Sequence, residues 1–305
     1  MSDSNTLFQP PGFERRNIAT TAGEINYYEA MPQGRDAIGT LVFLHTFGGG
    51  SSSFEWSRVY PSFSAEYRVL APDLPGWGYS EHQPIEYTAG FYRTAIREFI
   101  KNTGAGCPTI IAASLVAALC VWEATEQPEL GEHLVLVNPS GLSDFGRPYN
   151  GSLFGWVDSI ALLNQFLYDQ GIQNRTTIRG YLERVLFANP RRISEEMVDA
   201  YYESARQPNA RYAAFSFLKG NLSFDLAAYL PKLSVPTAFL WGEKNNYASP
   251  ETGRRLAALT PSVRYFAVIP DTGITPQLEL PAVTASAIRR AMFALAATPL
   301  GSGAA

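Results

Sequence analysis

The chain has 305 residues, of which 46% are hydrophobic and 17% charged, with a formal net charge of −4 at pH 7. This slightly acidic composition, without a run of Lys or Arg, excludes the basic surface on which nucleic-acid binding depends. Its two cysteines can build neither a disulfide framework nor a four-cysteine zinc site. We expect neither a bound metal nor a cofactor.

The amino-terminal residues 1–5 lack the basic segment and apolar core of a secretory signal. No apolar stretch approaches the roughly 18–20 residues that cross a bilayer as a helix. The sequence therefore predicts a cytoplasmic protein without a transmembrane segment.

Short apolar runs bounded by turn residues predict the strands of a central sheet. A hairpin comes first, because residues 18–21 and 25–28 flank the turn residues Ala22-Gly23. The later runs are apolar throughout, which is typical of strands buried on both faces. These later runs cover residues 40–44, 68–71, 109–113, 134–137, 237–241 and 264–269.

Helical patterns alternate with these runs. Thr88 can cap one helix, and residues 115–126 are apolar nearly all round, which predicts a central helix. Ser249-Pro250-Glu251 combines an N-cap, a proline at the first helical position and a first-turn acid. Such alternation predicts an α/β fold in which a mostly parallel sheet has helices on both faces.

The alternation stops between residues 142 and 226. This stretch contains no strand-like run and many aromatic residues, and Ser194 before Glu195 and Glu196 marks a helix start. We therefore expect residues 142–226 to form an all-helical insertion, or cap. It would separate a first core segment, residues 1–141, from a second, residues 227–305.

Four segments, in this order, resemble the α/β-hydrolase family with a helical cap. Residues 44–49 are similar to the family's His-Gly-x-Gly loop, and residues 73–80 to its loop after the fourth strand. Residues 112–117, Ala-Ala-Ser-Leu-Val-Ala, stand where the family has its Gly-x-Ser-x-Gly nucleophile elbow. The fourth segment pairs residues 240–244 with 273–281, which usually bear the acid and the histidine. The resemblance spans nearly the whole chain and implies an α/β-hydrolase fold.

The resemblance places Ser114 at the nucleophile position, on a sharp turn between a strand and a helix. The acid position holds Asn245, which can bond to an imidazole but cannot stabilise an imidazolium by charge. The histidine position holds Ile274, which has no titratable group. Because a serine hydroxyl needs an adjacent base to become nucleophilic, the triad is incomplete.

Replacement groups remain open alternatives. Asp144 is a candidate for a displaced acid, although a loop or capping role suits it better. A carboxylate near the altered positions becomes a base if burial raises its pKa, and the nearest in sequence are Glu243, Asp271 and Glu279. The three histidines, His45, His82 and His133, all precede the acid position.

The resemblance also implies an oxyanion hole formed by backbone amides. Its donors would be Leu115 and either Thr46 or Phe47, and such a hole can bind a ligand oxygen even without a base. A pocket between core and cap is the expected ligand site. The candidate lining residues are His45, Trp156, Phe166 and Tyr181.

Two classes of function follow. The joint loss of acid and base favours a pseudoenzyme that binds a small hydrophobic molecule between core and cap without hydrolysing it. The alternative is an enzyme, an esterase-like hydrolase or a lyase, that uses Ser114 with a non-standard base. A protein partner bound through the cap surface is a further alternative.

Overall fold

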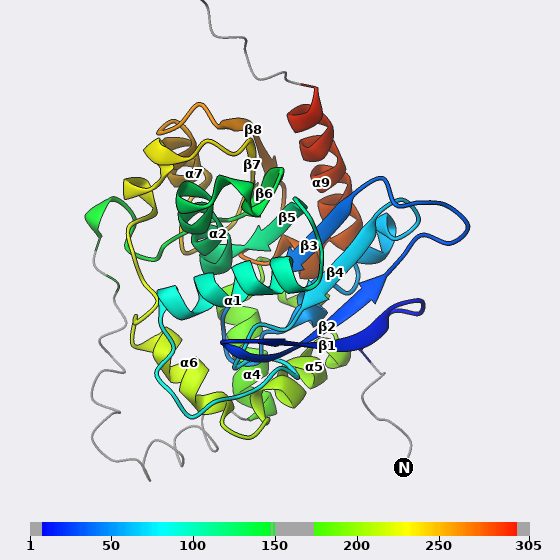
Figure 1. Ribbon diagram of the computed structural model, residues 1–305. Coiled ribbons are helices and arrows are strands. Elements are labelled where there is room, and N and C mark those ends of the chain that lie inside the picture. The colour runs from blue at the N-terminus through cyan, green and yellow to red at the C-terminus, as the bar shows by residue number, and fades with distance from the viewer. Residues whose placement is uncertain (1–7, 148, 150–173, 298–305) are drawn as a thin grey trace, which may run out of the picture.

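The computed structural model describes residues 8–147, 149 and 174–297. Within these residues, eight strands form one sheet in the order β1-β2-β4-β3-β5-β6-β7-β8 (Figure 1). The first two strands form the predicted hairpin, and β2 also runs antiparallel to β4. From β4 to β8 all neighbouring strands are parallel. The predicted mostly parallel α/β sheet is confirmed.

The strands coincide closely with the apolar runs. They are β1 (Glu14–Thr20), β2 (Gly23–Ala30), β3 (Thr40–Leu44), β4 (Arg68–Pro72), β5 (Thr109–Ala113), β6 (His133–Val137), β7 (Thr237–Gly242) and β8 (Val263–Ile269). The α-helices are α1 (Ala89–Asn102), α2 (Ser114–Glu126), α4 (Arg175–Tyr181), α5 (Glu195–Ala205), α6 (Ala210–Leu218), α7 (Pro250–Ala257), α8 (Pro276–Glu279) and α9 (Pro281–Ala296). Two shorter helical elements are the 3₁₀-helix η2 (Ser53–Trp56) and the π-helical turn η8 (Leu182–Leu186).

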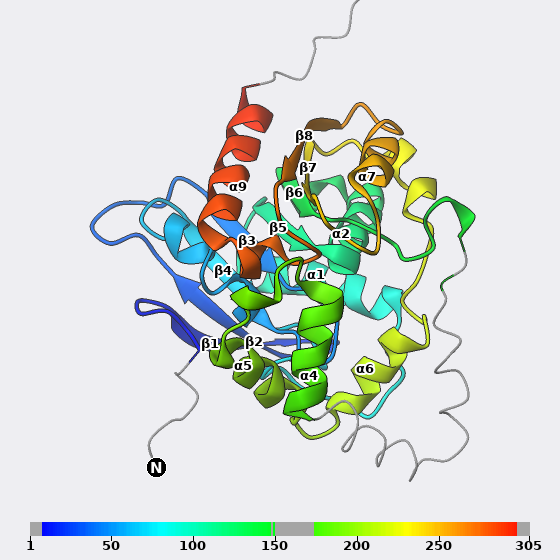
Figure 2. The same ribbon diagram turned by 180° about the vertical axis from the view of Figure 1, so that it is seen from behind.

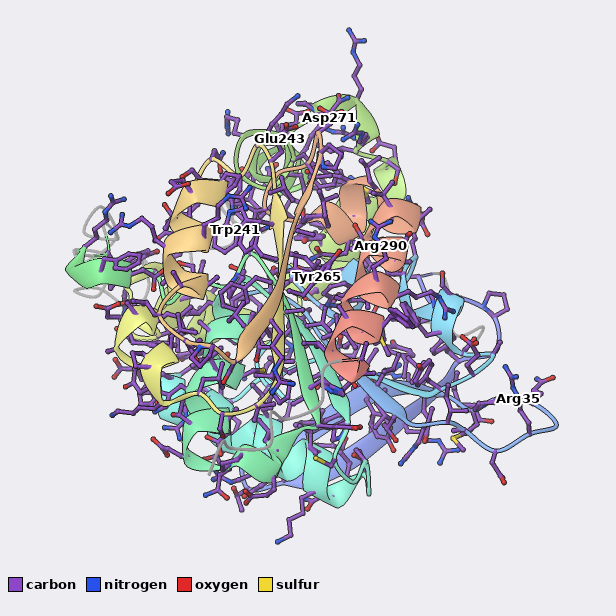
Figure 3. All side chains as sticks on the ribbon, turned by 90° about the horizontal axis from the view of Figure 1, so that it is seen from above. Arg35, Trp241, Glu243, Tyr265, Asp271 and Arg290 are labelled. Carbon is purple, nitrogen blue, oxygen red and sulfur yellow. The ribbon has the colours of Figure 1, made fainter. Side chains whose placement is uncertain are left out.

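Helices cover both faces of the sheet. Successive strand residues point to opposite faces, so Ile110 and Ala112 of β5 pack with α1 and α2, while Ile111 and Ala113 pack with α9. Seen from behind, α9 lies in front of the strands (Figure 2). Figure 3 shows α9, which carries Arg290, on the opposite side of the sheet from Trp241. Burial on both faces explains why the strands are apolar throughout.

The helix starts predicted from capping residues are confirmed. Each predicted cap accepts a hydrogen bond from a first-turn amide, namely Thr88 from Phe91, Ser194 from Met197 and Ser249 from Thr252. The sequence patterns did not predict α8 and α9. None of the helices in the described part of the chain combines the length and apolarity that a bilayer span requires.

The cap helices, α4, α5 and α6, lie between β6 and β7 in sequence and contain no strand within residues 174–226. They lie together at one end of the sheet (Figure 2). Ser204 of α5 donates to the Ser51 carbonyl at 3.0 Å and accepts from the Gly78 amide at 2.9 Å. Ser51 and Gly78 follow β3 and β4, so the cap helices dock at the edge where the parallel strands end.

Replacing either of two helical glycines by alanine should change the stability of the fold, in opposite directions at the two positions. A Cβ on Gly253 of α7 would lie 2.5 Å from the buried Trp241 ring, whereas a Cβ on Gly90 of α1 would have no atom closer than 3.9 Å. We expect Gly253→Ala to destabilise the fold by about 1–3 kcal/mol through overpacking. The control Gly90→Ala should stabilise it by up to about 1 kcal/mol, because alanine favours helix. Chemical denaturation measures both; stabilisation by both substitutions would contradict the packing of α7.

Candidate active site

A cavity of about 220 Å³, the inner pocket, lies between the sheet edge and the cap helices. Its walls come from the loops after β3, β5, β6, β7 and β8, and from α4, η8 and α6. Ser114, Asn245 and Ile274 all line it. The three positions that the resemblance assigned to nucleophile, acid and histidine therefore meet at one pocket, although they are far apart in sequence.

Ser114 sits in a strained turn. Strand β5 ends at Ala113 and α2 begins at Ser114, whose φ of +55° lies in the left-handed region. A non-glycine residue adopts this conformation at a cost of about 1–2 kcal/mol, so it persists only where the surrounding structure enforces it. This is the backbone geometry of a nucleophile elbow, which presents the serine hydroxyl above the sheet edge.

The inner pocket offers this hydroxyl no base. Among the described residues, no imidazole or carboxylate lines it, and the Ser114 hydroxyl makes no hydrogen bond. The titratable side chains that line it are Tyr149, Tyr181 and Tyr247. Burial raises the pKa of all three phenols, that of Tyr247 to about 12. These groups keep their protons at neutral pH and cannot accept one from Ser114.

The predicted acid and histidine positions have structural contacts instead. Asn245 Oδ1 accepts hydrogen bonds from the amides of Tyr247 (2.9 Å) and Ala248 (3.2 Å), which shapes the loop after β7. The Ile274 amide donates to the Leu186 carbonyl at the end of η8 at 2.9 Å. The Ile274 side chain packs against an apolar cluster that includes Leu186. An apolar contact between core and cap thus fills the histidine position.

Asp144 does not itself line the inner pocket, but it bonds to Ser140, which does. Its Oδ2 accepts from Ser140 Oγ at 2.6 Å, and its Oδ1 accepts from the amides of Gly141 (3.0 Å) and Leu226 (3.1 Å). Burial raises the pKa of this carboxyl, and the three hydrogen bonds oppose that shift. The carboxyl lines an outer hollow next to the inner pocket. These contacts fit a residue that braces the loop after β6.

The three carboxylates considered as replacement bases also have structural contacts. Glu279 accepts from the Gly273 amide at 2.5 Å and from the Ala188 amide at 3.0 Å. Glu243 accepts from the Asp271 amide at 2.9 Å. The Asp271 carboxylate bonds to Lys244 Nζ at 2.6 Å, and this contact lowers the pKa of Asp271. None of the three lines the inner pocket.

Two expectations near the β3 loop are corrected. The Thr46 amide is not an available oxyanion donor, because it donates to Glu55 Oε2 at 2.9 Å. His45 does not line the inner pocket: it is fully buried, its Nδ1 bonds to the Thr46 carbonyl at 2.6 Å, and its Nε2 accepts from the Leu74 amide at 2.9 Å. Both bonds together fix the neutral tautomer with the proton on Nδ1.

Four predicted site residues remain: two oxyanion donors and two aromatic residues of the cap. The amides of Phe47 and Leu115 donate to no acceptor within the described residues, so both are free to meet a ligand oxygen. Trp156 and Phe166 lie outside the described residues. Sequence reasoning did not single out Phe217 and Tyr247 as pocket residues; the aromatic richness of the cap and the proximity of Tyr247 to Asn245 were the available signals.

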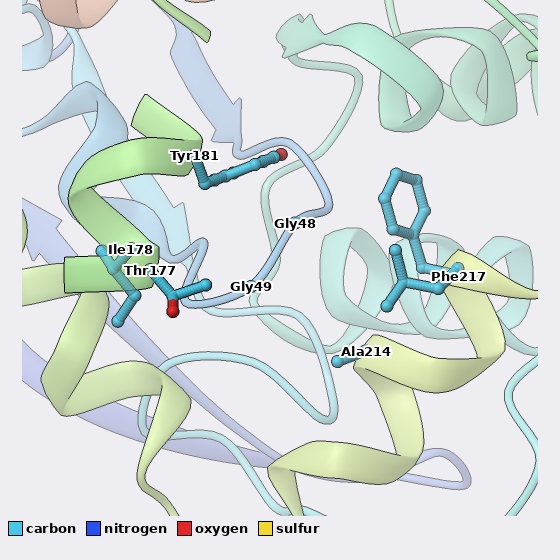
Figure 4. A pocket seen from close by; sticks show the side chains of 8 residues that line it. Gly48, Gly49, Thr177, Ile178, Tyr181, Ala214 and Phe217 are labelled. Atoms are coloured by element: carbon cyan, nitrogen blue, oxygen red, sulfur yellow. The ribbon is translucent and has the colours of Figure 1, made fainter. Parts of the chain in front are cut away.

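A second cavity of about 150 Å³, the side pocket, adjoins the first and shares Tyr181 and Phe217 with it. Figure 4 shows these two side chains entering from α4 and α6, with the loop of Gly48 and Gly49 between the two helices. A Cβ on Gly48 would lie 2.4 Å from the Tyr181 hydroxyl, so only glycine lets this ring approach the β3 loop. Because Tyr181 and Phe217 belong to both walls, the two cavities are direct neighbours.

Asn138 joins the ends of three strands below the inner pocket. Its Oδ1 accepts from the Gly242 amide at 2.9 Å, and its Nδ2 donates to the carbonyls of Gly273 (3.2 Å) and Ile274 (2.9 Å). Its φ of +49° also lies in the left-handed region. This amide therefore fixes the loops after β6, β7 and β8 relative to one another.

Known proteins resemble this chain over most of its length. A family model described as alpha/beta hydrolase fold matches residues 39–279. The uncharacterized hydrolase YugF of Bacillus subtilis is 26% identical over 247 residues, which are 80% of this chain and 85% of that protein. A 2-hydroxy-6-oxo-6-phenylhexa-2,4-dienoate hydrolase of Burkholderia cepacia is 25% identical over 255 residues, 78% of this chain and 82% of the relative.

A solved structure has the same fold. It is a serine hydrolase involved in carbazole degradation, with a TM-score of 0.74 and 22% sequence identity over 92% of this chain and 99% of that one.

Replacing Asn138 tests its role at the strand ends. Asn138→Ala leaves the buried Gly242 amide without an acceptor and keeps a Cβ in a left-handed conformation, so we expect a loss of about 2–4 kcal/mol. Asn138→Gly loses the same hydrogen bonds without that backbone strain and should be about 1 kcal/mol more stable than the alanine variant. Urea denaturation measures both. Equal stability of the two variants would show that the backbone is not held in this conformation.

Proposed function

The chain belongs to the α/β-hydrolase fold family, and we propose that it binds a small hydrophobic molecule between core and cap without hydrolysing it. The observation that carries the proposal is the composition of the inner pocket. Ser114, Asn245 and Ile274 line it together, and no described lining residue can accept a proton at neutral pH. This composition supports a binding role more than the proton transfer that a serine hydrolase needs.

The large effect of a missing catalytic histidine on turnover supports a binding role. In the serine protease subtilisin, removing the catalytic histidine alone lowers turnover by roughly 10⁶, about as much as removing the whole triad. The present chain has no base near Ser114 in its described part, and the predicted acid position is an amide. Binding between core and cap does not need either group.

The pocket walls indicate what kind of molecule would fit. Most of the inner pocket surface is apolar, and the side pocket is almost wholly so. The free amides of Phe47 and Leu115 would donate to one oxygen of the ligand. The proposed ligand therefore has an apolar body and an oxygen acceptor.

The alternative is an esterase-like or lyase-type enzyme that uses Ser114 with a base outside the usual triad. Two observations favour it: Ser114 lies in the strained turn of a nucleophile elbow, and the relatives YugF and the Burkholderia cepacia protein are named hydrolases. In this case the proton acceptor would have to come from the substrate itself, because the described pocket walls supply none.

Reaction with a fluorophosphonate probe separates the two functions. We expect no labelling of the natural chain, because its serine hydroxyl has no base. The double variant Asn245→Asp, Ile274→His restores an acid and an imidazole at the pocket wall and should gain labelling, read by intact mass spectrometry. The same double variant carrying Ser114→Ala serves as the control for labelling elsewhere. Rapid labelling of the natural chain would refute the binding proposal.

Ligand binding should also be independent of the Ser114 hydroxyl and of pH. With 4-phenylbutanamide as a neutral probe, Ser114→Ala should change the Kd by less than about twofold. The Kd should stay constant between about pH 7 and pH 9, because the lining phenols have pKa values raised above their usual value of about 10 and remain neutral throughout. Isothermal titration calorimetry checks both expectations; an inflection in Kd near neutral pH would reveal a titrating group in the site.

A further inference from the structure

Glu55 is a buried acid directly behind the inner pocket. It lies in η2, and its residue is fully buried. Its Oε2 accepts from the Thr46 amide at 2.9 Å, and its Oε1 accepts from Thr46 Oγ1 at 2.8 Å and from the Tyr201 hydroxyl at 2.9 Å. Within the described residues, neither Lys nor Arg forms an ion pair with it.

These contacts leave the charge of Glu55 without compensation. Buried carboxylates in proteins are usually paired with a cation, whereas this one is held only by neutral donors. A negative charge on this fully buried carboxylate is screened only weakly by water and salt.

The field of Glu55 reaches the pocket wall. Thr46, to which Glu55 bonds twice, itself lines the inner pocket. Tyr181 lines both cavities, and the charge of Glu55 contributes, after burial, to the raised pKa of that phenol. An anion in either cavity would therefore meet a like charge behind the wall.

In the described part of the two cavity walls, no cation offsets this charge. The described residues that line the two cavities include no Lys, Arg or His. Residues 150–173, which the structure does not describe, contain none of these residue types in their sequence. Arg147 lines the outer hollow, where it is exposed and shares the wall with Asp144.

We propose that Glu55 determines specificity by making the pocket reject carboxylates and other anions, so that the ligand is an uncharged apolar molecule with a neutral oxygen acceptor. Glu55 acts in two ways: it places a negative charge behind the wall, and it occupies the Thr46 amide that could otherwise donate to an anionic oxygen. The inference rests on the proposed binding function and defines its ligand class.

A series of three probes of nearly equal shape tests the charge preference: 4-phenylbutanamide, 4-phenylbutanoate and 4-phenylbutan-1-amine. At about pH 7.5 they are neutral, anionic and cationic, respectively. Isothermal titration calorimetry on the full chain should give at least tenfold tighter binding of the amide than of the carboxylate, equivalent to about 1.4 kcal/mol. The amine should also bind more tightly than the carboxylate, because both ions lose hydration but only the carboxylate is repelled by Glu55.

Two variants assign the effect to the charge. Glu55→Gln keeps a side chain of the same size without the charge, and should reduce the preference for amide over carboxylate to below about threefold. Tyr201→Phe removes one donor to Glu55 but keeps the charge, so it should retain the preference. It also controls for loosening of the contact between α5 and the core. Thermal unfolding verifies that both variants are folded.

Each result has one meaning. If the natural chain binds amide and carboxylate equally, the role of Glu55 is refuted while the binding function stands. If it rejects the amine as strongly as the carboxylate, the pocket excludes charge in general and Glu55 is not the determinant. A folded Glu55→Gln protein with the full preference has the same consequence. If no probe binds the natural chain, the proposed binding function fails and this inference fails with it. Because the probe series uses the natural chain, an unfolded variant does not leave the inference undecided.

Discussion

The turn from β5 into α2 is the constraint on which the rest of the structure depends. Every residue of β5 is buried, and so is most of α2, so neither element can shift to relieve the left-handed backbone at Ser114. The neighbouring strands are parallel and end at the same edge, which brings the loops after β3, β6, β7 and β8 to this turn. The cap helices then close the space above it. A pocket at this place is thus a result of sheet topology and does not depend on catalytic residues.

The residues at the predicted acid and histidine positions make structural contacts within the described part of the chain. Asn245 folds its own loop, Ile274 packs against the cap, and Asn138 holds three strand ends together. Each contact stabilises the position of the loop that carries it. At this edge of the sheet, the three side chains thus hold the loops in place through hydrogen bonds and apolar packing.

Much of the fold could be predicted because it follows from local patterns. Apolar runs marked the strands, and Thr88, Ser194 and Ser249 marked helix starts, since a cap needs only residues one turn apart. Helix α9 was missed because its many alanines give a weak contrast between its faces. For the site, the order of the motifs along the chain predicted only which positions meet at the pocket. The bond between Glu55 and Thr46 and the brace at Asn138 depend on side-chain positions that the folded chain alone sets.

The contact between Ile274 and η8 bears on how a molecule enters and leaves. The amide of Ile274 bonds to the carbonyl of Leu186, and the two side chains belong to the same apolar cluster. Any outward swing of η8 must break that bond and expose both side chains to water, which is unfavourable by about 25 cal/mol for each Å² of apolar surface. An imidazole at this position would tolerate the exposure better. We therefore expect the isoleucine to favour the observed packing of η8 against the core over a displaced one.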